Sequence, residues 1–126
     1  MTESKRVVVT GLGCVSPLGN TVAETWEKGS QGQSGIVRIE KFDPSEMRCQ
    51  IAGEVRNFEL PDLVPPKEAK KMDLFIHYAI AATQEALQDA ALEITEPLEE
   101  EVGISMGVGI GGLGCIEKYT KILLEQ

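Results

Sequence analysis

The sequence predicts an α/β fold, and three observations lead to this prediction. Residues 102–108 carry no charge and no polar group larger than Ser105, which is typical of a short strand buried on both faces. Residues 7–9 are three consecutive valines and favour a second central strand over 5–10. Both segments run into a glycine-rich turn and then into a helical pattern, the place where α/β proteins position their sites.

Composition limits the classes of function. The 126 residues are 42% hydrophobic and 25% charged, which is ordinary for one globular domain. A net charge of −8 argues against nucleic acid or an anionic membrane as a partner. Three widely spaced cysteines, Cys14, Cys49 and Cys115, fit neither a disulfide framework nor a metal site. We therefore expect reduced thiols and no cofactor. We also expect a cytoplasmic protein, because the N-terminus shows no signal peptide or transmembrane span.

The first half of the chain predicts one short helix. After the strand at 5–10 and a glycine-rich turn, Thr21 and Glu24 have the spacing of a capping box. The small residues Gly29, Ser30 and Gly32 weaken the end of that helix. Residues 36–66 lack clear periodicity and predict an irregular segment with a possible short strand at 50–55.

The second half predicts a long helix, a connection and a final helix. The long helix is expected from Lys67 to about Ala91, because apolar residues recur at steps of three and four. An acidic, proline-containing connection at 93–101 precedes the glycine-rich strand. Another amphipathic helix is expected after Gly114, and the sequence ends at Gln126 inside that pattern, so we expect it to belong to a longer protein.

Two glycine motifs are candidate sites. Gly11-x-Gly13 after a valine-rich strand partly matches a dinucleotide fingerprint, but Ser16 replaces the third glycine and no acid follows a second strand. A structural tight turn is therefore favoured over a nucleotide site. The turn at 107–114 lacks the ending of a phosphate-binding loop. It is either a tight backbone crossing or the wall of a site where something apolar meets Ile110.

Nucleophilic catalysis is not expected from the side chains present. Cys14 and Cys115 lie beside the glycine turns, but a reactive thiol needs a base, and the single candidate base is His77. His77 has no evident acid partner and fits an ordinary helix histidine.

Three lysines form a local basic patch in an acidic chain. Lys67, Lys70 and Lys71 would share one side of the first turns of the long helix. Cations are slightly unfavourable at a helix N-terminus, so the patch favours an anionic partner over a merely solvated helix start.

Five separated blocks of sequence stand out along the chain: residues 6–13, 16–20, 33–36, 71–73 and 107–113. Together they resemble the start of the β-ketoacyl-acyl-carrier-protein synthase II family of fatty-acid condensing enzymes. They occur in the family's order and spacing along the whole chain.

The resemblance implies a thiolase-like layered α/β/α/β/α fold, of which residues 1–126 would be an incomplete N-terminal domain. It implies a homodimer that elongates acyl chains by decarboxylative Claisen condensation, with acyl and malonyl groups carried by acyl carrier protein. The family's catalytic cysteine and two histidines lie beyond this chain, which covers roughly its first third. None of Cys14, Cys49, Cys115 or His77 matches them, so we expect no catalytic residue here and no condensation by this chain alone.

Two functional positions carry over by the resemblance. Ile110 matches a residue that lines the fatty-acyl pocket near the dimer interface, and Lys67, Lys70 and Lys71 match the face that receives acyl carrier protein. Two alternatives remain at this point. One is a truncated, non-catalytic fragment that binds carrier protein or another partner, and the other is a nucleotide-binding α/β domain.

Overall fold

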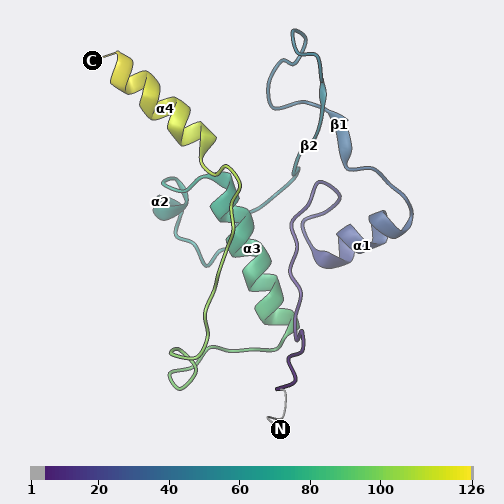
Figure 1. The fold of residues 1–126 in the computed structure, drawn as a ribbon, viewed down its shortest axis with the longest axis vertical. Helices are drawn as coiled ribbons and strands as arrows, with labels where there is room; N and C mark the ends of the chain where they lie inside the picture. Colours follow the sequence, from purple (N-terminus) through teal and green to yellow (C-terminus); the bar gives the residue numbers. More distant parts are fainter. Residues whose placement is uncertain (1–4, 126) are drawn as a thin grey trace.

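One long helix, α3 (Leu74–Asp89), lies at the centre of the molecule in the computed structural model, which describes residues 5–125. Figure 1 shows the β-hairpin and the last helix extending away from α3 in different directions, so the described chain is open rather than layered. The remaining elements in chain order are α1 (Val22–Ser30), β1 (Ile36–Arg38), β2 (Ile51–Gly53), α2 (Pro66–Ala69) and α4 (Leu113–Leu124).

Helix α1 confirms the predicted short helix and its cap. The hydroxyl of Thr21 accepts a hydrogen bond from the Glu24 N–H at 3.2 Å. The Glu24 carboxylate accepts in return from the N–H of Asn20 at 2.8 Å, one residue earlier than in the standard capping box. The helix ends at Ser30, and Gly32 then adopts a φ of 71°.

The segment predicted to be irregular contains a small antiparallel hairpin. Strand β2 lies inside the predicted 50–55, whereas β1 was missed; Val37 pairs with Ala52 at the centre of the register. Glu54 holds this hairpin together from a buried position, because its carboxylate accepts hydrogen bonds from the N–H groups of Glu40 at 3.0 Å and Lys41 at 3.4 Å. Three-residue strands carry too little periodicity to be recognised without such contacts.

The single long helix predicted from Lys67 to about Ala91 was wrong, because the structure divides it into α2 and α3. The chain leaves the helical conformation at Asp73, which has φ −76° and ψ 158°. The imidazole Nε2 of His77 lies 3.0 Å from the carbonyl oxygen of Ala69 and connects the two helices across the break. Apolar periodicity continues across the break, so it could not reveal a kink that depends on contacts between elements.

The two predicted central strands are also not formed. Residues 5–10 and 102–108 have no strand neighbour among residues 5–125, and Figure 1 shows 102–108 running beside α3. Val7 and Val9 are 91% and 80% exposed. A strand exists only through hydrogen bonds to a neighbouring strand, so an apolar sequence suited to a sheet interior stays single where no neighbour is present.

The apolar packing is centred on α3, although no side chain in 5–125 is fully buried. Phe58 packs edge-to-face on Tyr78 with ring centroids 4.9 Å apart, which attaches the segment after the hairpin to α3. Val64, six residues after Phe58 in the chain, is also buried. The predicted connection at 93–101 and the final helix α4 are both present.

Candidate functional site

An apolar groove lies between α3 and the extended segment before the glycine-rich turn. It has a volume of about 490 Å³, and Thr83 and Gln84 are the polar residues among those that line it. Phe75 lines the end nearest the turn, and the same groove includes Met106 and Val108. The other lining residues are Leu63, Ile76, Ala79, Ile80, Leu87 and Ile104. Ile110 follows directly in the chain and is 75% exposed.

The glycine-rich turn has one packed end and one open end. A β-carbon on Gly111 would lie 2.9 Å from the Phe75 ring, and one on Gly112 would lie 2.7 Å from Oδ2 of Asp73. Gly112 also adopts a φ of 72°, which strongly favours glycine. By contrast, a β-carbon on Gly107 or Gly109 would meet nothing within 4 Å. The tight-crossing interpretation therefore applies to residues 111–112 and not to 107–109.

The pKa of Cys115, in the first turn of α4, is shifted away from that of a reactive thiol. A hydrogen bond to the Asp73 carboxylate raises the pKa of Cys115, partial burial and the negative charge of Asp73 act in the same direction, and Lys118 opposes them. A raised pKa keeps the thiol protonated, and the protonated form is a poor nucleophile. The His77 Nε2 lies 3.0 Å from the Ala69 carbonyl oxygen, so this ring nitrogen is used in a contact with the backbone.

The Gly11-x-Gly13 motif is a crossing point between the N-terminal segment and α3. A β-carbon on Gly13 would overlap the carbonyl oxygen of Ala82, and one on Gly11 would overlap that of Ala86. The intervening Leu12 donates its N–H to Oδ2 of Asp89 at 2.9 Å. Helix backbone thus occupies the space that a pyrophosphate would need. The nucleotide-site alternative is wrong here, and the structural turn is right.

Carboxylates of α3 hold this crossing in place. Glu85 accepts from the N–H of Cys14 at 2.9 Å and from the N–H of Val22 at 2.8 Å, so one side chain joins the N-terminal segment to the start of α1. Sequence reasoning missed this role. Glu85 and Asp89 are spaced i, i+4, which placed them on one helix face, but nothing local indicated their backbone partners.

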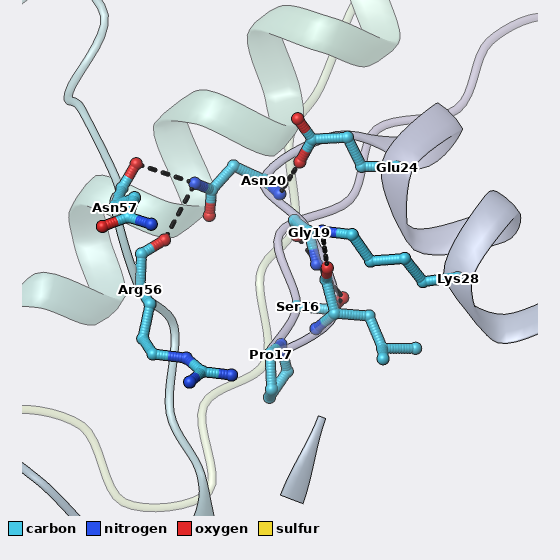
Figure 2. Close-up of a pocket in the computed structure, with 9 residues that line it drawn as sticks. Ser16, Pro17, Gly19, Asn20, Glu24, Lys28, Arg56 and Asn57 are labelled. Atoms are coloured by element: carbon cyan, nitrogen blue, oxygen red, sulfur yellow. Dashed lines mark hydrogen bonds between the residues drawn. The ribbon is translucent and has the colours of Figure 1, made fainter. Parts of the chain in front are cut away.

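A polar cleft of about 310 Å³ surrounds the Ser16-Pro17-Leu18-Gly19-Asn20 turn. Figure 2 shows the residues that line it. Its polar groups are largely used within the protein. Lys28 Nζ donates to the Leu18 carbonyl oxygen at 2.6 Å, and the amide of Asn20 donates to the carbonyl oxygens of Arg56 at 3.1 Å and Asn57 at 2.9 Å.

The same turn also contacts the hairpin. A β-carbon on Gly35 or Gly53 would lie 2.9 Å or 2.8 Å from the Pro17 ring, so both positions leave room for that ring. The cleft is therefore a junction that connects the turn to α1 and to the hairpin. The sequence indicated a turn at this point and did not indicate what it packs against.

The three lysines are exposed, but they do not lie on the first turns of a long helix. Lys67 belongs to α2, Lys70 is its C-cap, and Lys71 follows and pairs with Glu68 at 2.8 Å. The predicted electrostatic cost does not apply to Lys70 and Lys71, because cations near a helix C-terminus are favourable. The patch is nonetheless accessible to a partner.

No helix within residues 5–125 combines the length and the hydrophobicity that crossing a membrane requires. The described residues also contain no group of three or more His, Cys, Asp or Glu side chains arranged to hold a metal ion.

The arrangement of these elements matches solved ketosynthases. The crystal structure of a beta-ketoacyl synthase from Burkholderia phymatum superposes with a TM-score of 0.78 at 28% identity, over 95% of this chain and 30% of that chain. The ishigamide ketosynthase/chain length factor superposes with a TM-score of 0.61 at 34% identity, over 71% of this chain and 22% of that chain. The fold is therefore that of the thiolase-like ketosynthases.

Residues 4–125 match the family model of the beta-ketoacyl synthase N-terminal domain, and the chain belongs to this family. A similar protein of Vibrio harveyi is 49% identical over 124 residues, and one of Synechocystis is 45% identical over 124 residues; each alignment covers 98% of this chain. A Staphylococcus aureus protein is 42% identical over 126 residues. All three are named 3-oxoacyl-[acyl-carrier-protein] synthase 2, and the chain spans about 30% of the length of each.

Proposed function

We propose that this chain is the N-terminal part of a 3-oxoacyl-[acyl-carrier-protein] synthase II. The observation that carries the proposal is the uninterrupted similarity of 42 to 49% identity along the chain to proteins of that name. In this proposal residues 1–126 form an incomplete N-terminal domain, and the layered α/β/α/β/α arrangement arises when the remaining sheet strands are added. The enzyme would act in the cytoplasm as a homodimer.

The reaction is a decarboxylative Claisen condensation. The acyl group of acyl-acyl carrier protein is first transferred to a cysteine thiol; a new thioester forms as the carrier-protein thioester breaks and the carrier protein leaves as its free thiol. Loss of CO₂ from malonyl-acyl carrier protein leaves a carbanion that attacks the acyl carbonyl carbon, so a carbon–carbon bond forms and the cysteine departs as thiolate. Two histidines and an oxyanion hole stabilise the developing charge. The proposal assigns these groups to sequence beyond the present 126 residues.

The contribution of this chain would be to bind the substrates. Ile110 is assigned to the wall of the acyl pocket, and its exposed side chain beside an apolar groove supports the assignment, because an alkyl chain there would remove apolar surface from water. Lys67, Lys70 and Lys71 are assigned to the docking of acyl carrier protein, and their exposure supports this. Charge pairs of this kind mainly steer encounter and orientation.

The proposal can be tested with a chimeric enzyme. The matching N-terminal 30% of the Vibrio harveyi relative would be replaced by residues 1–126, and condensation of acyl- with malonyl-acyl carrier protein would be measured. We expect the chimera to be active and this chain alone to be inactive. A chimera in which the relative's catalytic cysteine is replaced by alanine is the matched control.

A chimera that folds but does not condense, beside an active unmodified relative, would contradict the proposal. If this chain nevertheless bound acyl carrier protein by itself, the alternative of a non-catalytic carrier-binding fragment would be favoured instead.

A further inference from the structure

Asp73 occupies the N-cap position of α3 but does not cap that helix. Aspartate at an N-cap ordinarily accepts a hydrogen bond from its own helix, which contributes about 1 kcal/mol. Here the backbone has the extended conformation suited to a cap, yet the carboxylate makes no cap hydrogen bond. The side chain therefore does not satisfy the N-terminal N–H groups of α3.

The Asp73 carboxylate lies instead at the beginning of α4. A β-carbon on Gly112 would lie 2.7 Å from its Oδ2 and one on Gly114 would lie 4.0 Å from its Oδ1, and the proximity of this carboxylate raises the pKa of Cys115. The N-cap residue of α4 is Gly112, which has no side chain to supply a cap. A carboxylate at a helix N-terminus is electrostatically favourable. Asp73 thus supplies to α4 the negative charge that α4 lacks locally.

This contact holds one end of the glycine-rich turn. Phe75, two residues after Asp73, packs on Gly111. The start of α3 therefore contacts Gly111 through the Phe75 ring and Gly112 through the Asp73 carboxylate. At the other end of the turn, a β-carbon on Gly107 or Gly109 would meet nothing within 4 Å. Ile110 immediately precedes Gly111 in the chain. Its position therefore depends on where Asp73 and Phe75 hold the turn.

We propose that Asp73 is a positioning residue for the acyl-pocket wall: its carboxylate fixes the Gly111–Gly112 end of the turn, and this sets where Ile110 limits the acyl chain. The inference rests on the proposed function for its consequence in catalysis. The contact from Asp73 to the start of α4 does not depend on that function and can be tested separately.

The first experiment tests the contact in the full-length protein. In Asp73→Asn the negative charge is lost, so the pKa of Cys115 falls while Lys118 continues to favour the thiolate. The pH midpoint for alkylation of Cys115 by iodoacetamide, followed by peptide mass spectrometry, is expected to move to lower pH. Asp62→Asn, in the exposed loop before α2, is the control and should leave the midpoint unchanged. An unchanged alkylation midpoint in Asp73→Asn would show that the Asp73 carboxylate does not contact the start of α4.

The second experiment tests selectivity. The ratio of kcat/KM for a short and a long acyl-acyl carrier protein would be measured for wild type, Asp73→Asn and Gly112→Ala. We expect both variants to change this ratio by roughly 10-fold, the size associated with a misplaced methylene-sized group in a pocket. Gly112→Ala disturbs the same end of the turn without altering a charge. It therefore still tests the positioning role if Asp73→Asn does not fold.

Ile110→Phe is the reference variant, since it narrows the pocket directly and is expected to shorten the chains accepted. If Ile110→Phe changes the ratio and neither Asp73→Asn nor Gly112→Ala does, the positioning role is wrong. If Ile110→Phe also has no effect, the pocket assignment in the proposed function is wrong. The alkylation result then still decides whether Asp73 anchors α4.

Discussion

At the scale of single residues, glycine is used here where two backbones cross. Gly11 and Gly13 stand two apart in an extended segment, and they meet carbonyl groups of Ala82 and Ala86, which stand four apart on a helix. These two periods allow a strand-like segment to lie against one helix face. Small residues on both sides make the contact close enough for Leu12 to hydrogen-bond with Asp89.

This crossing predicts the cost of adding one methyl group. Gly13→Ala places a β-carbon on the rigid backbone of α3, so we expect a loss of about 1 to 3 kcal/mol in the free energy of unfolding. Urea denaturation followed by circular dichroism would measure it. Gly103→Ala is the matched control, because a β-carbon there meets nothing within 4 Å. Equal stability of the two variants would show that the crossing is not close.

At the scale of elements, the break between α2 and α3 creates the surface carrying the lysines. The break places Lys70 and Lys71 at the C-terminal end of a short helix, and the side chains remain exposed. Figure 1 shows α2 and the β-hairpin on different sides of α3.

Charge reversal on this surface is predicted to weaken carrier-protein recognition. In the full-length enzyme, Lys70→Glu with Lys71→Glu should raise KM for acyl carrier protein roughly 10-fold at low salt, equivalent to about 1.4 kcal/mol, with little change in kcat. The effect should shrink as salt screens the charges. Lys41→Glu, in the hairpin loop, is the control. An unchanged KM at low salt would remove the docking assignment.

At the scale of the whole molecule, apolar surface is left uncovered. Several large side chains in the extended segments and in α4 are well exposed, among them Val7, Val9, Ile104, Ile110 and Leu124. Patches of this kind are normally covered by other protein, and unpaired extended segments can pair with further strands.

The 126-residue chain by itself is therefore predicted to self-associate. Sedimentation velocity at micromolar concentration should show species larger than a monomer, and a hydrophobic dye should bind strongly. The chimera described above, which restores the rest of the enzyme, should bind less dye per chain. A monomeric chain that binds no dye would contradict the prediction.

The sequence by itself determined the features that depend on neighbours along the chain. The α1 cap depends on Thr21 and Glu24, the start of α4 on the glycines before it, and the connection at 93–101 on its proline and acidic residues. The sequence also carried the blocks that indicated the family, because they occur in one order and spacing. Such signals lie in a few neighbouring residues or in the order of sequence blocks, so they can be recognised without knowledge of contacts between elements.

Only the tertiary structure decided the features that depend on residues far apart in the chain. The predicted long helix is interrupted at Asp73, whose carboxylate lies near Gly112 at the start of α4, and Glu85 joins two segments through backbone groups more than sixty positions away. The segments 5–10 and 102–108 stayed unpaired because a strand forms through hydrogen bonds to a neighbour, not from its own composition. The pattern of side chains indicates which face of a segment is apolar. Which other segment covers that face depends on the tertiary structure.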